Sequence, residues 1–194
     1  MTQRVGVMGG TFDPPHAGHV AIAQSFLNSG LLDRLLILPT PVPPHKPDAK
    51  LTPYEHRLQM TRICFEYLER TSVDDFELAL PSPHYTIYTL RKLSKQNPQA
   101  EFSLCIGQDS LNSLKSWYKW EELVSEYDIY VTRRPDATEG DDAVSSGRIY
   151  FVDHQPHRAS STAIRDFLKK GEIPEHLLCD GVPDYIREHR LYQQ

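Results

Sequence analysis

Residues 9–19 read Gly-Gly-Thr-Phe-Asp-Pro-Pro-His-Ala-Gly-His, and they directly follow the apolar run at residues 5–8. A short apolar run, then glycines, then an amphipathic stretch predicts a strand, a tight loop and a helix. The glycines let the backbone approach a ligand closely, and the N–H groups at a helix start attract phosphate. His16 and His19 are three residues apart, so on a helix both side chains point the same way. Two imidazoles beside such a loop indicate chemistry on phosphorus.

A plainer interpretation of this stretch is open when the histidines are taken alone. The pair Asp13-Pro14 then forms an ordinary turn, and His16 and His19 are surface or capping residues. The preceding Gly-Gly-Thr-Phe-Asp-Pro favours a functional site instead. The whole stretch resembles the signature of the nucleotidyltransferase superfamily, Gly-x-Phe-Asp-x-x-His-x-Gly-His. That resemblance implies a Rossmann-like α/β fold and transfer of a nucleoside monophosphate from a nucleoside triphosphate.

The bulk properties of the chain are those of an ordinary globular protein. Its 194 residues suit one domain, 1–194, with a sizeable core, and its 39% hydrophobic and 24% charged residues are unremarkable proportions. We expect no membrane partner, because no apolar run approaches membrane length, and we expect a cytoplasmic location, because the first residues do not form a signal peptide. A formal net charge of −5 disfavours nucleic-acid binding, which needs a basic face. Nothing in the sequence indicates an oligomeric state.

The three cysteines, Cys64, Cys105 and Cys179, are far apart in the sequence. Their number is odd and their spacing matches no metal-binding pattern. We therefore expect three free thiols, in keeping with a reducing compartment, and no structural metal site.

Apolar runs alternate with amphipathic segments along the chain. This alternation predicts βαβ units in a single doubly wound, mainly parallel sheet with helices on both faces. Strands are expected at 5–8, 35–38, 73–78, 102–106, 129–131 and 149–152. Helices are expected at 20–27, from a Thr52 cap to about 70, at 85–93, 120–124 and 160–168, with a short helical C-terminus at 174–178 and 183–189. Gly30 and Gly171 are expected to end helices, and the proline-rich residues 39–48 should form an extended loop.

A second motif, Ser160-Ser161-Thr162-Ala163-Ile164-Arg165, lies at a predicted helix start. Hydroxyl and N–H groups there suit phosphate oxygens, and Arg165 follows about one turn later. Taken alone, the motif is better explained as a simple serine cap with a surface arginine. Beside the first motif, it resembles the Ser-Ser-Thr-x-x-Arg element that follows the last strand in this superfamily. Ala159 stands where that family often has isoleucine.

Further candidates lie in the middle of the chain. Gly107 and Asp109 follow a central strand, at the edge where open α/β sheets bind ligands; Asp109 suits a ribose hydroxyl or an adenine-side group, or caps a helix. Trp117 offers a flat ring for a pyridine base, although a tryptophan is more often part of a core. The pair Arg133-Arg134 suits a phosphate or forms a solvated basic turn.

These motifs follow one another along nearly the whole chain, and in this order they resemble the bacterial nicotinate-nucleotide adenylyltransferases. The resemblance implies adenylyl transfer from ATP to nicotinate mononucleotide, giving deamido-NAD and pyrophosphate. It implies mononucleotide-binding roles for Thr86, Trp117, Tyr118 and Arg134. It implies ATP-binding roles for Gly9, Gly10, Thr11, Phe12, Gly107, Asp109, Ser160, Ser161 and Thr162. The catalytic residues that it implies are His16, His19, Lys46 and Arg165.

The chemistry of this reaction needs positioning and charge neutralisation. The acceptor phosphate is mostly dianionic near neutral pH, because its second pKa is about 6, so no general base is needed. The arginines, Lys46, the two histidines and helix N-termini suit the anionic reactants. The motifs contain Asp13 but no carboxylate cluster, so we expect Mg²⁺ to be held mainly by substrate phosphates.

Alternative functions remain open from the sequence. One is adenylyl transfer to nicotinamide mononucleotide or to phosphopantetheine; Trp117-Tyr118 and Arg133-Arg134 argue against phosphopantetheine and, likewise, against a cytidylyltransferase. Another is a catalytically silent nucleotide-binding module, which would be expected to lack His16, His19, Lys46 or Arg165, and all four are present. Aminoacyl-tRNA synthetases share a similar histidine signature, but this chain lacks their length and a basic surface for tRNA.

Overall fold

The computed structural model describes residues 2–43, 50–133, 148–155 and 157–193. In the first half, the elements are β1 (Gln3–Gly10), α1 (Ala17–Asn28), β2 (Arg34–Pro39), α2 (Tyr54–Phe65), β3 (Thr71–Val73), the 3-10 helix η1 (Phe76–Ala79), α3 (Thr86–Gln96) and β4 (Ala100–Gly107). In the second half, they are α4 (Gln108–Asn112), η2 (Leu114–Ser116), α5 (Trp120–Glu126), β5 (Ile129–Arg133), β6 (Ile149–Asp153), α6 (Ser161–Lys169), η4 (Glu175–Leu177) and α7 (Val182–Glu188).

The six strands form one sheet in the order β3-β2-β1-β4-β5-β6, and every neighbouring pair is parallel. The chain winds outward from β1 in one direction and from β4 in the other, which confirms the predicted doubly wound sheet. Strand order reverses between β1 and β4, and open α/β sheets bind ligands at the carboxyl ends of such strands. Gly10 and Gly107 are the last residues of these two strands, so the first motif and the Gly107-Asp109 pair meet at one crevice.

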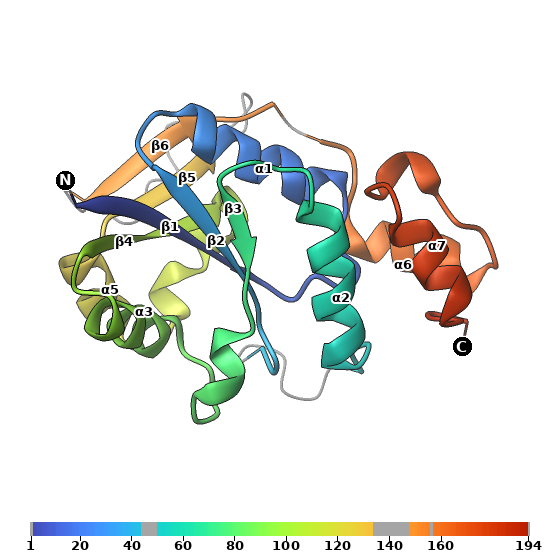
Figure 1. The fold of residues 1–194 in the computed structure, drawn as a ribbon, viewed down its shortest axis with the longest axis horizontal. Helices are drawn as coiled ribbons and strands as arrows, with labels where there is room; N and C mark the ends of the chain where they lie inside the picture. Colours follow the sequence, from blue (N-terminus) through green and yellow to red (C-terminus); the bar gives the residue numbers. More distant parts are fainter. Residues whose placement is uncertain (1, 44–49, 134–147, 156, 194) are drawn as a thin grey trace.

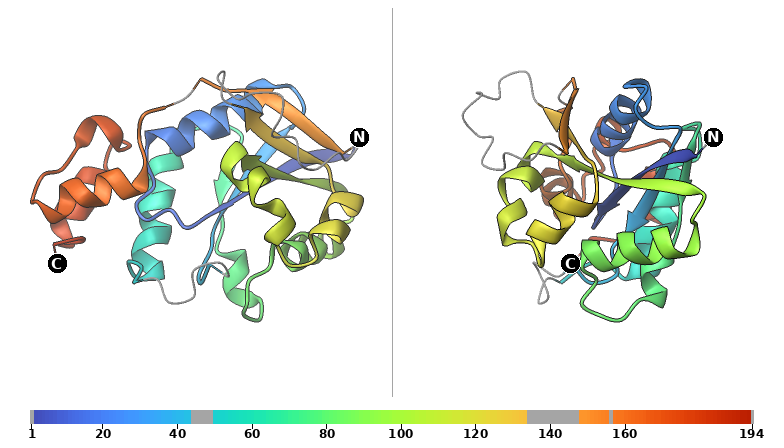
Figure 2. Two further views of the ribbon diagram at one scale, coloured as in Figure 1. Left: turned by 180° about the vertical axis from the view of Figure 1, so that it is seen from behind. Right: turned by 90° about the vertical axis from the view of Figure 1, so that its left-hand side faces the viewer.

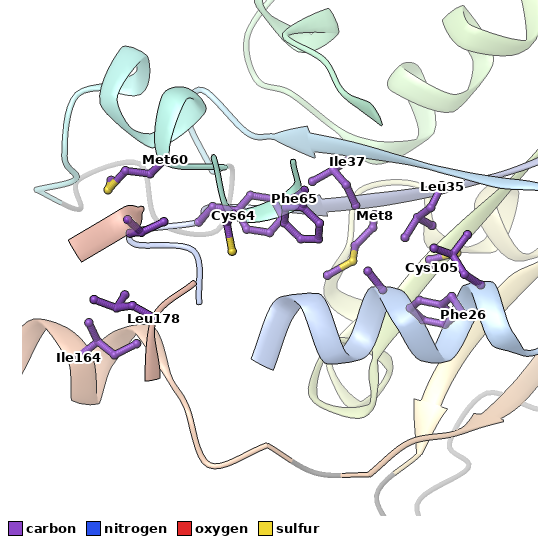
Figure 3. Packing of buried hydrophobic residues seen from close by; sticks show 14 of the residues in the cluster. Met8, Phe26, Leu35, Ile37, Met60, Cys64, Phe65, Cys105, Ile164 and Leu178 are labelled. Atoms are coloured by element: carbon purple, nitrogen blue, oxygen red, sulfur yellow. The ribbon is translucent and has the colours of Figure 1, made fainter. Parts of the chain in front are cut away.

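Helices cover both faces of the sheet (Figures 1 and 2). On one face, a hydrophobic cluster joins α1 and α2 to the sheet through residues such as Phe26, Leu35 and Cys105. The same cluster continues to Ile164 of α6 and to Leu178, so the C-terminal helices pack onto it (Figure 3). A second cluster packs α3, α4 and α5 onto the other face. None of the helices in the described ranges is both long and apolar enough to cross a membrane.

Some element boundaries differ from the sequence-based predictions. The strand expected at 73–78 ends at Val73 and is followed by η1, because the two aspartates at 74–75 interrupt the apolar run. Thr52 does not cap α2: Pro53 is the N-cap, and the Thr52 N–H donates to Asp13. Helix α2 ends at Phe65 rather than near residue 70, and only a 3-10 turn forms within 174–178. Helix ends at Gly30 and Gly171 are confirmed, with φ of 73° and 79°.

The prediction of three free thiols is wrong for two of them. Cys64, in α2, forms a disulfide with Cys179, just before α7, across a sequence separation of 115 residues. The chain brings α7 back against α2, a proximity that spacing in the sequence does not reveal. Cys105 is a free thiol inside the core, where burial raises its pKa.

Candidate active site

The buried aromatic side chain of Phe12 supports the loop after β1. Phe12 is 1% exposed, and its ring meets the edge of the His19 ring at 4.9 Å between centroids. A Cβ on Gly10 would lie 2.9 Å from the Phe12 ring, so this position requires glycine. The buried ring therefore anchors both the glycine loop and one of the two predicted catalytic histidines.

The two histidines lie together at the start of α1, as predicted. His16 is the N-cap residue, and its ring stacks on the His19 ring with centroids 3.8 Å apart. The His16 backbone N–H donates to Nδ1 of His19 at 3.2 Å. Because this Nδ1 accepts, a neutral His19 carries its proton on Nε2 and can donate there. A Cβ on Gly18 would come within 3.0 Å of the His16 ring, which explains the glycine between them.

Both imidazoles are neutral at neutral pH in the free protein. Burial, together with the nearby His157, lowers the pKa of His16 to about 4. Burial also lowers the pKa of His19 well below its ordinary value, and His16 adds to this effect. The pair therefore presents polarised N–H donors to a phosphate rather than fixed positive charges.

Two hollows lie beside the histidine pair. His16, Gly107 and Asp109 line one hollow, together with Thr132, His157 and other residues. His19 lines the other, whose walls also include Thr11, Phe12, Asp13, Lys50, Ser161, Thr162 and Arg165. The structure thus brings together nine of the predicted site residues. The stacked rings separate a hollow at the β4 edge from one walled by the loop after β1 and by α6.

The second motif is bonded to the first. Ser161 Oγ donates to the Pro14 carbonyl at 2.9 Å, and Arg165 Nη1 donates to the Asp13 carbonyl at 2.6 Å. Arg165 Nη2 also reaches Thr162 Oγ1 at 3.3 Å. Ser160 Oγ accepts from the Ala163 N–H at 3.2 Å, so the capping interpretation is confirmed for this side chain. These bonds seat the start of α6 beside the loop that follows β1.

Asp13 uses both carboxylate oxygens within the protein. Oδ1 accepts from the Tyr192 hydroxyl at 2.7 Å, and Oδ2 accepts from the Thr52 N–H at 3.3 Å. Within the described ranges, no three or more His, Cys, Asp or Glu side chains gather into a metal-binding group. Asp13 therefore holds the C-terminal segment and the start of α2 against the first motif.

Three of the residues predicted to bind the mononucleotide, Thr86, Trp117 and Tyr118, lie in segments that pack against the second hydrophobic cluster. Thr86 is the first residue of α3, and the preceding Tyr85 stacks on Tyr118 with ring centroids 4.3 Å apart. This stack places the Thr86 and Tyr118 segments side by side. Trp117 is half-buried against the second hydrophobic cluster. None of these residues lines the two hollows, and Lys46 and Arg134 lie outside the described residues.

We expect Trp117→Ala to raise the acceptor KM about tenfold and to leave the ATP KM nearly unchanged, because stacking on an aromatic ring contributes on the order of 1 kcal/mol or more. Steady-state kinetics with each substrate varied in turn measures both values. Trp120→Ala is the matched control, since Trp120 is also half-buried and opens the adjacent helix α5. Early melting with an unchanged acceptor KM would make Trp117 a core residue alone.

Sequence reasoning missed Arg57, the residue that joins the loops of the site. Arg57 lies on α2, is 1% exposed, and donates to the carbonyls of Thr11, Thr40, Pro41 and Thr52 at 2.7–2.9 Å. It thereby ties the loop after β1 to the loop after β2. No motif signalled this role, because an arginine within a helical pattern ordinarily indicates a solvent-facing position.

Comparison with known proteins agrees with this geometry. Residues 7–167 match the Cytidylyltransferase-like family, and the chain belongs to this class of nucleotidyltransferases. A probable nicotinate-nucleotide adenylyltransferase of Symbiobacterium thermophilum is 36% identical, over 97% of this chain and 95% of its own length. One from Shewanella sp. (strain MR-7) is also 36% identical, over 97% of this chain and 99% of its own length. Within the class, the chain is a member of the nicotinate-nucleotide adenylyltransferase family.

Solved structures confirm the fold. The Plasmodium falciparum nicotinic acid mononucleotide adenylyltransferase complexed with NaAD aligns with a TM-score of 0.84, covering 98% of this chain and 97% of that one, at 20% identity. The same protein complexed with APC aligns with a TM-score of 0.82 over the same shares. The predicted Rossmann-like α/β fold is therefore confirmed.

Proposed function

We propose that the protein transfers the adenylyl group of ATP to nicotinate mononucleotide, giving deamido-NAD and pyrophosphate in NAD biosynthesis. The observation that carries this proposal is the stacked histidine pair between two hollows at the β1/β4 crevice, with Arg165 and the α6 start joined to it. The family membership of the chain supports the choice of acceptor. We further propose that residues 1–194 act as one cytoplasmic domain whose ligands are these small molecules.

In the proposed reaction, an acceptor phosphate oxygen attacks the α-phosphorus of ATP, and the bond from that phosphorus to pyrophosphate breaks. The attacking phosphate is already largely dianionic, so no proton has to be removed from it. The protein has to align the two anions and stabilise the charge that develops. We assign this stabilisation to Nε2–H of His19, to His16 and to the cations Lys46 and Arg165.

The remaining residues are assigned to two binding regions, one for ATP and one for the mononucleotide. We propose that ATP lies along the residues at the ends of β1 and β4 and at the start of α6, namely Gly9, Gly10, Thr11, Phe12, Gly107, Asp109, Ser160, Ser161 and Thr162. We propose that the mononucleotide contacts Thr86, Trp117, Tyr118 and Arg134. Mg²⁺ fits this scheme as an ion carried by the ATP phosphates, where it would neutralise charge; the Asp13 carboxylate already accepts two hydrogen bonds.

The test is pyrophosphate release from ATP with three acceptors: nicotinate mononucleotide, nicotinamide mononucleotide and phosphopantetheine. We expect kcat/KM for nicotinate mononucleotide to exceed that for the nicotinamide form by on the order of 10² or more. A carboxylate accepts at both oxygens, whereas an amide has one acceptor and an NH₂ donor. If backbone N–H groups near Thr86 and Tyr118 face this substituent, the amide NH₂ would point a donor at donors. Each N–H left without an acceptor would weaken binding by roughly 1–3 kcal/mol.

The same assay separates the alternatives. Comparable kcat/KM values for the two mononucleotides would contradict the selectivity and make the protein a dual-specificity enzyme. Preference for phosphopantetheine would contradict the proposed acceptor. Absence of pyrophosphate release with every acceptor would indicate a nucleotide-binding module without this activity.

A further inference from the structure

Glu77 is a buried carboxyl group that none of the site motifs includes. It lies on η1, the short green helix that follows β3 in Figure 1, and is 6% exposed. In the described ranges, no lysine, arginine or histidine forms an ion pair with it. Burial raises its pKa to about 7, an effect that the hydroxyls of Thr89 and Thr40 only partly oppose. Burying a carboxyl group without a paired cation costs folding free energy, so we look for a functional reason for the position of Glu77.

On one side, the Glu77 carboxyl contacts the helix that opens the proposed acceptor site. Thr89 Oγ1 donates to Glu77 Oε1 at 2.8 Å, and Thr89 is 2% exposed. Thr89 lies one turn into α3, and its N–H donates to the Tyr85 carbonyl at 3.3 Å. Tyr85 in turn stacks on Tyr118. The carboxyl is thus bonded to the helical turn that presents Thr86.

On the other side, the 3-10 helix that carries Glu77 packs against β2, whose last residue precedes Thr40. The Thr40 N–H donates to the Gly10 carbonyl at 2.8 Å, and its carbonyl accepts from Arg57 at 2.9 Å. Arg57 also holds the Thr11 carbonyl at 2.7 Å. The 3-10 helix that carries Glu77 therefore lies between the proposed acceptor helix, which Glu77 contacts through Thr89, and β2, which is followed by the residue bonded to the proposed ATP loop.

We propose that Glu77 is a positioning residue that fixes the start of α3, and with it the acceptor-binding segment, relative to the phosphate loop. It acts through Thr89 and touches no substrate. The proposal rests on the function proposed above for the acceptor side, and it predicts that losing Glu77 affects the acceptor far more than ATP.

The experiment compares Glu77→Ala, Glu77→Gln and Thr89→Val with the wild-type protein, varying ATP and nicotinate mononucleotide in turn. Glu77→Ala should raise the acceptor KM about tenfold, because Thr89 loses its buried partner, while the ATP KM stays within about twofold. Glu77→Gln should stay near wild type, since its amide oxygen still accepts from Thr89. Thr89→Val keeps the side-chain shape and should shift the acceptor KM in the same direction as Glu77→Ala. The two effects should not add in the double variant, because both remove one contact.

Two further measurements make the result decisive. Leu90→Ala removes a fully buried α3 side chain without touching the Glu77 contact, so it should lower Tm while keeping the ratio of the two KM values. Hydrogen exchange at the Tyr88 and Thr89 amides, which both bond to the Tyr85 carbonyl, should quicken in Glu77→Ala but not in Glu77→Gln. Equal rises in both KM values, failure of Gln to rescue, or unchanged exchange would each overturn the proposal. Wild-type turnover tests the proposed function separately, and the exchange measurement does not depend on it.

Discussion

His19→Ala should lower kcat by about 10²–10³ and leave the fold intact, because one pre-aimed donor to the charge of the transition state is lost. The donor is Nε2–H, since Nδ1 accepts from the His16 backbone N–H. Its direction is fixed by the stacked His16 ring and by the edge contact with Phe12. Pyrophosphate release at saturating substrates measures kcat, and thermal unfolding checks the fold. His16→Ala should behave similarly.

Two conservative variants separate the donor from the local structure. Asparagine at position 19 keeps an acceptor near Nδ1 for the His16 N–H but has no group at Nε2. Glutamine extends an NH₂ donor toward the Nε2 position. We therefore expect His19→Asn to be as slow as His19→Ala and His19→Gln to recover part of the rate. Turnover within a few-fold of wild type for both His16→Ala and His19→Ala would refute the catalytic assignment.

The local parts of the site were predictable from the sequence because their determinants are contiguous. Glycines after an apolar run indicated the turn at the end of β1, and three-residue spacing placed His16 and His19 on one side of α1. The position of Gly107 directly after a central strand was enough to place it at the ligand-binding edge of the sheet, because the carboxyl ends of parallel strands lie at the same edge. Helix starts are predictable for the same reason, because the capping residue is next to the helix in the sequence, as Ser160 is at the start of α6.

Long-range contacts were not predictable in this way. The Cys64–Cys179 disulfide depends on α7 returning to α2, and the Tyr192–Asp13 hydrogen bond depends on the path of the C-terminal segment. Arg57 and Glu77 gave no signal, since charged residues in a helical or turn pattern ordinarily face solvent. Their burial arises only when loops from three different strands converge, and the partners that make burial tolerable are backbone carbonyls and hydroxyls.

Arg57→Ala should produce the largest loss of stability, about 3–5 kcal/mol, because four partly buried carbonyls lose the same buried charged donor together. For a domain of this size, such a loss lowers Tm by roughly 6–20 °C. The carbonyls belong to the loops after β1 and β2 and to the start of α2. Activity should therefore fall more than the folded fraction does, since the loop that carries Thr11 loses its anchor.

The control for this prediction is Arg62→Ala, on the same helix. Arg62 is about half exposed and its ion pair with Asp75 spans 3.8 Å, so its loss should change stability by less than about 0.5 kcal/mol. Arg57→Lys tests geometry, because an ammonium is a point donor and cannot reproduce the planar guanidinium fork that reaches all four carbonyls. We expect it to recover only part of Tm and of kcat/KM. If Arg57→Ala melts within about 2 °C of Arg62→Ala, the carbonyls find other donors and Arg57 does not hold the two loops together.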